Sequence, residues 1–265
     1  MHVRIEMISL PVNNLEQAVE WYERLGYSAE YDGADNQRAR VTVGNGQWIQ
    51  LVRTGRQTNM NFFNDEGYEM YPCTIRTADV HGMHRRLASS GWDAGECLDE
   101  CGYNFKAYDP DGNRLHLWGG FIGFENPAAD GIETVYIPVA DLKSSSDWYI
   151  KYFGAVLERP GQYQFHLLPS GQTLMLIEIK DGKRLRIEAE LQKEQYGVSL
   201  AVTDFSGLMR ALKNGGQPIV EVREGEEARQ RMIIADPSGN AIRISEEIGD
   251  LRIASEETDL CLQQG

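Results

Sequence analysis

Cysteines, basic residues and long apolar runs are all scarce in this sequence. Four cysteines in 265 residues are too few for a disulfide-stabilised scaffold. Lysines and arginines number 26 against 40 aspartates and glutamates, and the net charge of −14 disfavours nucleic-acid and anionic-membrane partners. No apolar run approaches the length that spans a bilayer, and a strand-like pattern begins at once, without the layout of a signal peptide. We therefore expect a cytoplasmic protein that binds neither nucleic acid nor membrane.

Motifs of common catalytic and metal sites are missing as well. The chain has no GxxxxGK[ST] phosphate loop, no GxSxG turn and no GxGxxG dinucleotide fingerprint. Cys97 and Cys101 form a C-x3-C pair, and His81 and His84 lie three residues apart. Neither pair has the further ligands of a zinc site. We interpret them as reduced thiols and as histidines on a helix surface.

The sequence does contain a repeat of about half its length. The turn motif DPDGN at residues 109–113 recurs as DPSGN at residues 236–240. At the same offset LPVNNLEQAVEWY matches IPVADLKSSSDWY, and at nearly the same offset GQWIQLV matches GQTLMLI. Repeats in one order predict two homologous domains. We place them at residues 1–124 and 131–247, with residues 248–265 as a C-terminal tail.

Each half repeats once more, faintly. SLPVNNLEQAVEWYERLGY and TIRTADVHGMHRRLASSGW both read as a strand, a polar turn, an amphipathic helix and a glycine. Apolar residues recur at helical spacing, Asx residues precede the helices, and strand-like runs follow them. The pattern predicts an α+β fold of four βαβββ modules. It leaves open which modules pair with each other.

The order of these motifs resembles the vicinal oxygen chelate superfamily. V-x-D-L leads into WY and LG, and DPDGN precedes the last strand. That superfamily contains glyoxalase I, bleomycin-resistance proteins and extradiol dioxygenases, and the resemblance covers residues 3–247. It implies two glyoxalase-like domains in which paired modules form curved mixed sheets around a cavity. It implies no single reaction, because one scaffold hosts many chemistries.

In metal-dependent members, the resemblance implies a ligand from the first and from the last strand of each module. The corresponding residues are Met7, Gln50, Pro72 and His116 in the first half and Thr134, Met175, Gly197 and Arg243 in the second. Gln50 and His116 are only two possible donors where a catalytic site normally has three, and Arg243 would repel a cation. Glu6 and Glu133 are neighbours of two of these positions, but strand alternation turns them to the opposite face. We expect no metal and no other cofactor, unless the register at Gln50 and His116 is misread.

Strand alternation also predicts which side chains line the cavities. In the first half these are Met7, Ser9, Trp48, Gln50, Thr74, Arg76, His116 and Trp118. The tryptophans would form flat walls, and Arg76, His116 and Gln50 would hold polar groups, so we expect an aromatic ligand with an acidic or carbonyl group. In the second half they are Thr134, Tyr136, Met175, Ser199, Arg243 and Ser245. We expect that half to be mainly structural, with Tyr136 and Arg243 as its candidate ligand contacts.

The function predicted first is a metal-free small-molecule-binding protein of the sequestering or resistance type, with its main cavity in the first half. The acidic balance would suit a cationic compound. The alternative is an enzyme of the same superfamily. It would be a divergent metal-dependent lyase or dioxygenase, or a metal-free isomerase or cyclase with His116 as its catalytic acid or base. Four modules in one chain can complete both cavities, so we expect a monomer or a homodimer.

Overall fold

The predicted strand–helix–strand–strand–strand order occurs four times along the chain. The structure, a computed structural model, describes residues 1–33, 36–99, 102–120, 130–185, 187, 196–224 and 229–247. The helices are α1 (Leu15–Leu25), α2 (Val80–Ser89), α3 (Leu142–Phe153) and α4 (Phe205–Asn214). The first two modules contain strands β1 (Val3–Val12), β2 (Ser28–Asp32), β3 (Arg38–Gly44), β4 (Gln47–Arg53), β7 (Cys73–Arg76), β8 (Leu98–Asp99), β9 (Tyr103–Tyr108) and β10 (Arg114–Trp118). The last two contain β11 (Gly131–Val139), β12 (Val156–Arg159), β13 (Tyr163–Leu167), β14 (Thr173–Glu178), β15 (Val198–Val202), β16 (Ile219–Glu224), β17 (Gln230–Ala235) and β18 (Ala241–Glu246). The short strands β5 (Phe62–Phe63) and β6 (Glu69–Met70) form a hairpin between the first two modules.

The modules pair across the two halves of the sequence. One eight-stranded sheet, which we call the β1 sheet, has the order β16-β17-β18-β15-β1-β4-β3-β2 and so joins the first module to the fourth. The other, the β11 sheet, has the order β12-β13-β14-β11-β7-β10-β9-β8 and joins the second module to the third. The seams are the antiparallel pairs β1–β15 and β7–β11. The predicted α+β class of four βαβββ modules is confirmed, while neither half of the sequence builds a sheet by itself.

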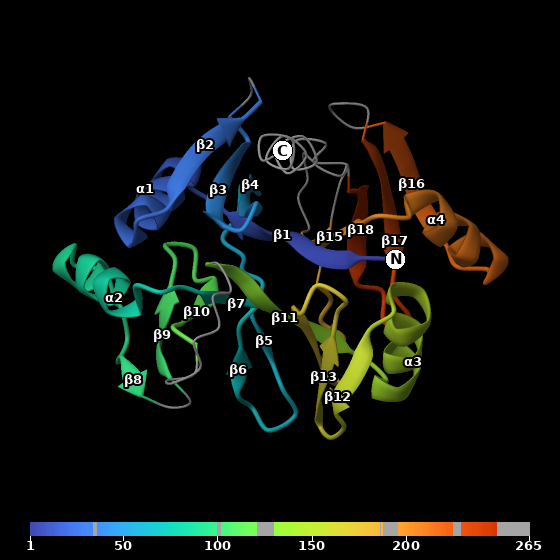
Figure 1. Ribbon diagram of the computed structural model, residues 1–265. Coiled ribbons are helices and arrows are strands. Elements are labelled where there is room, and N and C mark those ends of the chain that lie inside the picture. The colour runs from blue at the N-terminus through green and yellow to red at the C-terminus, as the bar shows by residue number, and fades with distance from the viewer. Residues whose placement is uncertain are drawn as a thin grey trace, which may run out of the picture.

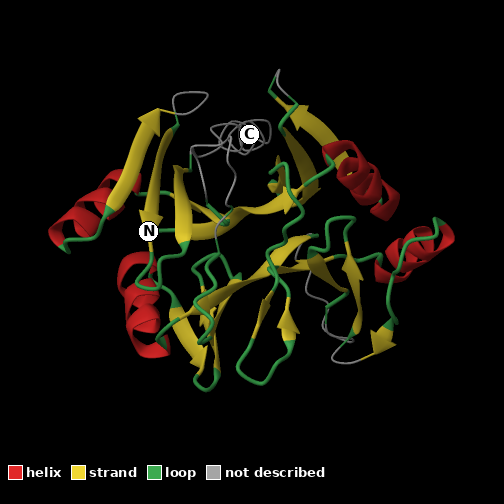
Figure 2. Ribbon diagram, turned by 180° about the vertical axis from the view of Figure 1, so that it is seen from behind, coloured by secondary structure: helices red, strands yellow, loops and turns green. Residues whose placement is uncertain are grey.

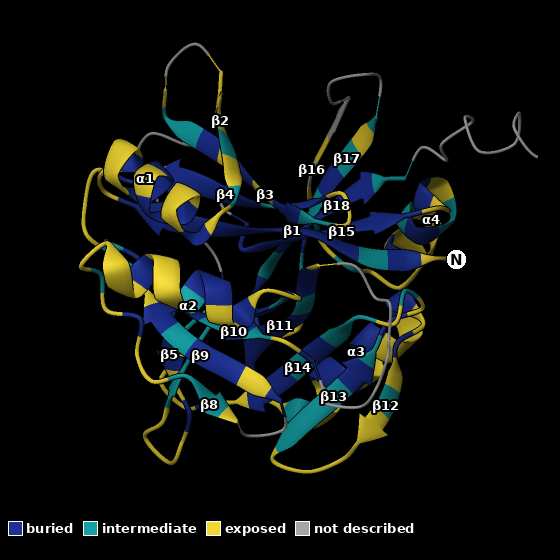
Figure 3. Ribbon diagram, turned by 60° about the vertical axis from the view of Figure 1, so that its left-hand side comes forward, coloured by how far each residue is buried: buried dark blue, intermediate teal, exposed yellow. Residues whose placement is uncertain are grey.

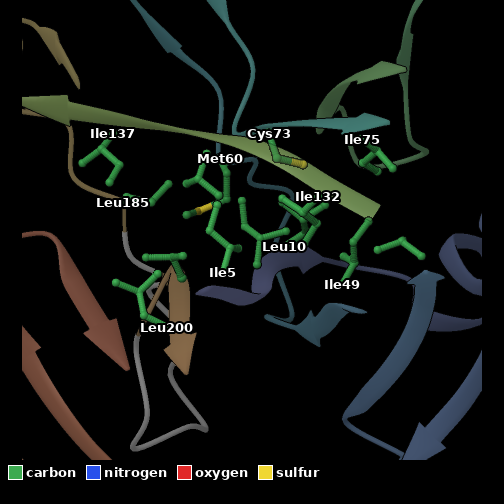
Figure 4. Close-up of a cluster of buried hydrophobic side chains, with 14 of the residues drawn as sticks. Ile5, Leu10, Ile49, Met60, Cys73, Ile75, Ile132, Ile137, Leu185 and Leu200 are labelled. Carbon is green, nitrogen blue, oxygen red and sulfur yellow. The ribbon is translucent and has the colours of Figure 1, made fainter. Parts of the chain in front are cut away.

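The two sheets lie back to back and curve away from each other, as Figures 1 and 2 show from opposite sides. Helices α1 and α2 pack together on one flank, and α3 and α4 on the other. The long strands β1 and β11 cross at the centre, where Ile5, Leu10 and Ile132 meet in the core (Figure 4). Each such buried side chain stabilises the fold by roughly 1.5–3 kcal/mol. The edge strands β2 and β12 are largely exposed (Figure 3), whereas the central strands β1 and β11 are almost entirely buried.

An Asx residue caps the N-terminus of each described helix, as the sequence pattern predicts. The Asn14 side chain accepts a hydrogen bond from the backbone N–H of Gln17, and Asp79, Asp141 and Asp204 cap the other helices in the same way. Such a cap stabilises a helix by about 1 kcal/mol. Gly26 ends α1 at a positive φ of 108°, a conformation that suits glycine.

The two DPxGN turns connect the sheets. Asn113 is fully buried and donates from Nδ2 to the carbonyl oxygen of Pro11, in the other sheet, at 2.9 Å. Its equivalent, Asn240, donates to the carbonyl oxygen of Pro138 at 2.8 Å. The Oδ1 atom of Asn113 also accepts a hydrogen bond from the backbone N–H of Met60 at 3.1 Å. Each repeated turn therefore holds the first strand of a module in the opposite sheet.

Some predicted features lie outside the described residues. These are the C-terminal tail from residue 248 and Cys101. In the parts of the chain that are described, no helix is both long enough and apolar enough to cross a membrane.

We predict that Asn113→Ala lowers the free energy of unfolding by about 2–4 kcal/mol, because the carbonyl group of Pro11 and the N–H of Met60 lose their buried partner. Asn240→Ala should cost a similar amount. Urea unfolding measures both. The control is Asn214→Ala at the exposed end of α4, with an expected change within about 0.5 kcal/mol. If Asn113→Ala unfolds at the same urea concentration as this control, the turns do not hold the sheets together.

Candidate functional site

The site residues predicted from the sequence are divided between the two sheets. Met7, Ser9, Trp48, Gln50 and Arg243 lie in the β1 sheet, and Thr74, Arg76, His116, Trp118 and Tyr136 lie in the β11 sheet. The prediction of one main cavity built by the first half is therefore wrong. The reason is the module pairing, which puts the two modules of that half in different sheets.

Glu6 points to the same face of the β1 sheet as Ser199 and Arg243. The prediction from strand alternation, which turned Glu6 away from this face, is wrong. A β-bulge shifts the register between Ile5 and Met7 where β1 pairs with β15. A bulge adds a residue to one strand, so the simple alternation of side chains fails there.

The repeated glutamines Gln47 and Gln172 hold the bulges in place. Gln47 donates from Nε2 to the carbonyl oxygen of Ile5 at 2.8 Å, and its Oε1 accepts from the N–H of Ile132 at 2.9 Å. Gln172 makes the reciprocal pair. Its Oε1 accepts from the N–H of Ile5 at 2.7 Å, and its Nε2 donates to the carbonyl oxygen of Ile132 at 2.7 Å. An equivalent bulge lies between Ile132 and Thr134 in β11. The GQW and GQT motifs thus position both bulges and tie β1 to β11.

Glu6 is the centre of a buried hydrogen-bond network on the concave face of the β1 sheet. Its Oε2 accepts from the hydroxyl groups of Ser199 at 2.8 Å and Ser245 at 2.7 Å, and from Nη2 of Arg243 at 3.2 Å. Arg243 also donates from Nε to Ser199 at 2.9 Å and from Nη1 to the hydroxyl group of Tyr196 at 2.7 Å. Glu6 and Arg243 are only 3% and 7% exposed, so this is a buried ion pair with its remaining groups satisfied.

The surroundings of Glu6 stabilise its charged form. Burial alone would raise the pKa of the carboxyl group, but the positive charge of Arg243 and the hydroxyl groups of Ser245 and Ser199 outweigh burial and lower it. Glu6 is therefore ionised at neutral pH and holds Arg243 in a fixed position.

A cleft of about 320 Å³ lies on the concave face of the β1 sheet, beside this network. Its lining residues are Glu30, Tyr31, Asp32, Arg38, Arg40, Trp48, Gln50, Tyr196, Arg231 and Arg243. The guanidinium group of Arg40 lies over the ring of Trp48, 4.1 Å from the ring centroid. Arg243 is paired with Glu6, which leaves three arginines against two carboxylates in the lining, so the cleft is locally positive although the whole chain carries −14. The local charge of this lining is therefore opposite in sign to the net charge of the chain.

Arg40, Arg231 and Tyr196 are site residues that sequence reasoning missed. The RAR motif of β3 contained a usable signal, because alternation places Arg38 and Arg40 on one face of the strand. Arg231 had no such signal. It reaches this cleft only because the fourth module pairs with the first.

His116 lies on the concave face of the β11 sheet. Its Nδ1 is 2.9 Å from the hydroxyl oxygen of Thr74, which is 3.0 Å from the hydroxyl group of Tyr136. Burial, together with the charges of Lys106 and Arg114, lowers the pKa of His116 to about 4. At neutral pH the imidazole is therefore uncharged and has no spare proton to act as an imidazolium acid.

The β5–β6 hairpin packs against this second face. Phe62 from β5, Tyr136 from β11 and Ile177 from β14 form one buried cluster, at 2%, 5% and 1% exposure. Tyr71 stacks beside it, with ring centroids 4.6 Å from Tyr136 and 4.9 Å from His116. Side-chain packing thus occupies the centre of this face.

Comparison with known proteins gives a family match for part of this chain and a shared fold for most of it. Residues 4–117 match the model of the Glyoxalase/Bleomycin resistance protein/Dioxygenase superfamily. The structure of glyoxalase I from Zea mays is similar over 92% of this chain and 92% of that chain, with a TM-score of 0.63 and 16% sequence identity. The family-model match covers residues 4–117 of this chain, and the similarity to this structure shows a shared fold. A putative dioxygenase from Bacillus subtilis subsp. subtilis str. 168 is similar over 91% of this chain and 84% of that chain, with a TM-score of 0.64 and 13% identity. No curated protein matches the chain.

The positions that the resemblance assigns to metal ligands fall in both sheets, and the residues present do not fit a divalent cation. In the β1 sheet they are Met7, Gln50, Gly197 and Arg243, and in the β11 sheet Pro72, His116, Thr134 and Met175. The carboxylate of Glu6, the nearest substitute ligand, is paired with Arg243, whose permanent positive charge would repel a metal ion. No group of three or more His, Cys, Asp or Glu side chains that could hold a metal occurs among the described residues.

We predict that Arg243→Met lowers the free energy of unfolding by about 3 kcal/mol, because buried Glu6 loses its closest counter-charge and keeps only the more distant Arg229 at 3.8 Å. The double variant Glu6→Gln/Arg243→Met should recover much of this loss. Urea unfolding at neutral pH measures both, with Arg24→Met, which breaks an exposed ion pair on α1, as the control. Equal losses in the single and double variants would contradict a charge imbalance as the cause.

The lowered pKa of His116 predicts a specific acid sensitivity. Unfolded histidine titrates near pH 6.5, so the unfolded state takes up the proton first and stability falls as the pH drops from about 6.5 to about 4. His116→Asn keeps a partner for Thr74 and should reduce this loss by on the order of 2 kcal/mol. Urea unfolding at a series of pH values measures it. Burial raises the pKa of Asp109 to about 7, so protonation of this carboxyl group favours the folded state as the pH falls. This contribution is the same in His116→Asn and in the unsubstituted protein, so it cancels in the comparison.

The matched control for that series is His81→Asn on the exposed side of α2, which removes a histidine from outside the site. If His116→Asn keeps the full acid sensitivity of the unsubstituted protein, the imidazole is not held neutral by its surroundings.

Proposed function

We propose that the protein is a metal-free small-molecule-binding member of the superfamily, of the sequestering or resistance type. Its site is the cleft of the β1 sheet. The observation that carries this proposal is the buried Glu6–Arg243 pair, which takes the centre of the face where metal-dependent members hold their cation. The pair leaves an open cleft of about 320 Å³ directly beside it.

The lining of the cleft has the composition of a binding site. Trp48, Tyr31 and Tyr196 supply flat apolar surface, and the arginines supply directional donors. Small-molecule sites typically combine aromatic walls with a few well-placed polar groups. The seam between β1 and β15 provides a rigid, buried floor for these groups, since β15 is buried along its whole length.

Proton-transfer chemistry has less support than binding. A general acid or base works best with a pKa near the working pH. The surroundings lower the pKa of Glu6 and lower that of His116 to about 4, so neither group is set for proton transfer at neutral pH. The metal-free isomerase or cyclase alternative therefore lacks a suitable group at either of these positions.

The first test uses the fluorescent probe 8-anilinonaphthalene-1-sulfonate. We predict saturable binding of one probe per chain to the native protein, unchanged by EDTA. Trp48→Ala should weaken binding about tenfold or more, because an aromatic wall of the cleft is lost. Trp118→Ala removes the half-buried tryptophan of the β11 sheet and is the matched control, with no expected effect on affinity.

Elemental analysis of the same protein tests the metal-free part of the proposal. The protein is loaded with Ni, Mn, Zn, Fe or Co and then dialysed, and we expect no stoichiometric metal. A stoichiometric metal that is lost in His116→Ala, or probe binding that depends on Trp118 and not on Trp48, would overturn the proposal.

A further inference from the structure

We infer that the ligand of the β1-sheet cleft is an aromatic acid, and that Arg40 and Arg231 bind its anionic group while its rings stack on Trp48. This inference rests on the proposed function, because it names the class of compound that the same cleft binds. The anionic group is a carboxylate or another oxyanion of similar shape.

The first support is charge that is not neutralised. Arg40 and Arg231 form no ion pair with any residue in the described part of the chain. Glu30 is directly opposite Arg40 in the β2–β3 pairing and still makes no ion pair with it. In a chain with 40 carboxylates and 26 basic residues, two arginines that line one cleft without an ion pair are unexpected. An incoming anion would satisfy both with charge-assisted hydrogen bonds, which are about twice as strong as neutral ones.

The second support is hydrogen-bond donors without acceptors. The indole Nε1 of Trp48 and the Nε of Arg231 are buried and have no hydrogen-bond partner. Buried polar groups are nearly always paired, so each exception needs an explanation. Both residues line the same cleft, and the guanidinium group of Arg40 lies over the Trp48 ring, 4.1 Å from its centroid. Acceptor oxygens that enter the cleft would supply the missing partners once Arg40 moves off the ring.

The third support is the origin of these groups. Arg40 and Trp48 come from β3 and β4 of the first module, whereas Arg231 comes from β17 of the fourth. The two modules meet only at the seam between β1 and β15 in this sheet. A ligand held from both sides therefore spans this seam. It should raise the melting temperature, because a ligand that binds only the folded state stabilises it.

The experiment compares two probes with the same ring skeleton. 8-Anilinonaphthalene-1-sulfonate carries a sulfonate group, and N-phenyl-1-naphthylamine is neutral. We expect the sulfonate to bind roughly 30-fold more tightly in fluorescence titrations with the full-length protein, because charge-assisted hydrogen bonds discriminate by this amount. Its affinity should fall several-fold when NaCl is raised to about 0.5 M, while that of the neutral probe stays the same.

Variants locate the anionic group. Arg231→Gln and Arg40→Gln should each weaken sulfonate binding about tenfold and change neutral-probe binding less than about twofold. Arg231→Lys keeps the charge but loses the Nε donor, and should fall between Arg231→Gln and the unsubstituted protein. Arg24→Gln removes the same charge from the exposed side of α1, and is the control for net charge.

The outcomes separate the inference from the proposed function. A sulfonate preference that disappears in Arg231→Gln but not in Arg24→Gln supports the inference. Equal, Trp48-dependent binding of both probes overturns the inference and leaves the proposed function standing. If neither probe binds in a Trp48-dependent way, the proposed function itself is overturned.

Discussion

Two hydrogen bonds from buried asparagine side chains to backbone carbonyl groups hold the arrangement of the sheets. Asn113 reaches Pro11, and Asn240 reaches Pro138, each from one sheet to the first strand of a module in the other. Both asparagines are fully buried, so an unmade bond there would not be replaced by water. The turns therefore fix β1 and β11 against each other, and every residue of the concave faces is positioned by these two strands or their neighbours.

The site on the β1 sheet follows from a local irregularity in β1. The bulge after Ile5, held by Gln47 and Gln172, turns Glu6 into the concave face. There Arg243 balances its charge, and two serine hydroxyl groups donate hydrogen bonds to it. The guanidinium group of Arg243 supplies the positive charge beside Glu6, and further arginines line the neighbouring cleft.

Much of the fold was readable from sequence, and part of the site was too. The Asx caps, the repeated turns and the apolar spacing of α1 each act locally, so they predict the βαβββ module correctly. Alternation correctly put Trp48, Gln50 and Arg243 on a concave face. It failed at Glu6, because the bulge depends on hydrogen bonds from Gln47 and Gln172, which come from other strands. It also gave no reason to group Arg231 with Arg40, since residues so far apart in sequence meet only through strand pairing.

The sequence by itself determined the module, its fourfold use and the residue types on each strand face. These follow from interactions within a few turns or between neighbouring strands of one module. Only the tertiary structure decided that the first module pairs with the fourth and the second with the third. Every module has a similar first strand that could pair with that of any other, so local sequence does not distinguish the partners. Because the first module pairs with the fourth, the arginines of these two distant modules share one cleft, which no local pattern in the sequence could predict.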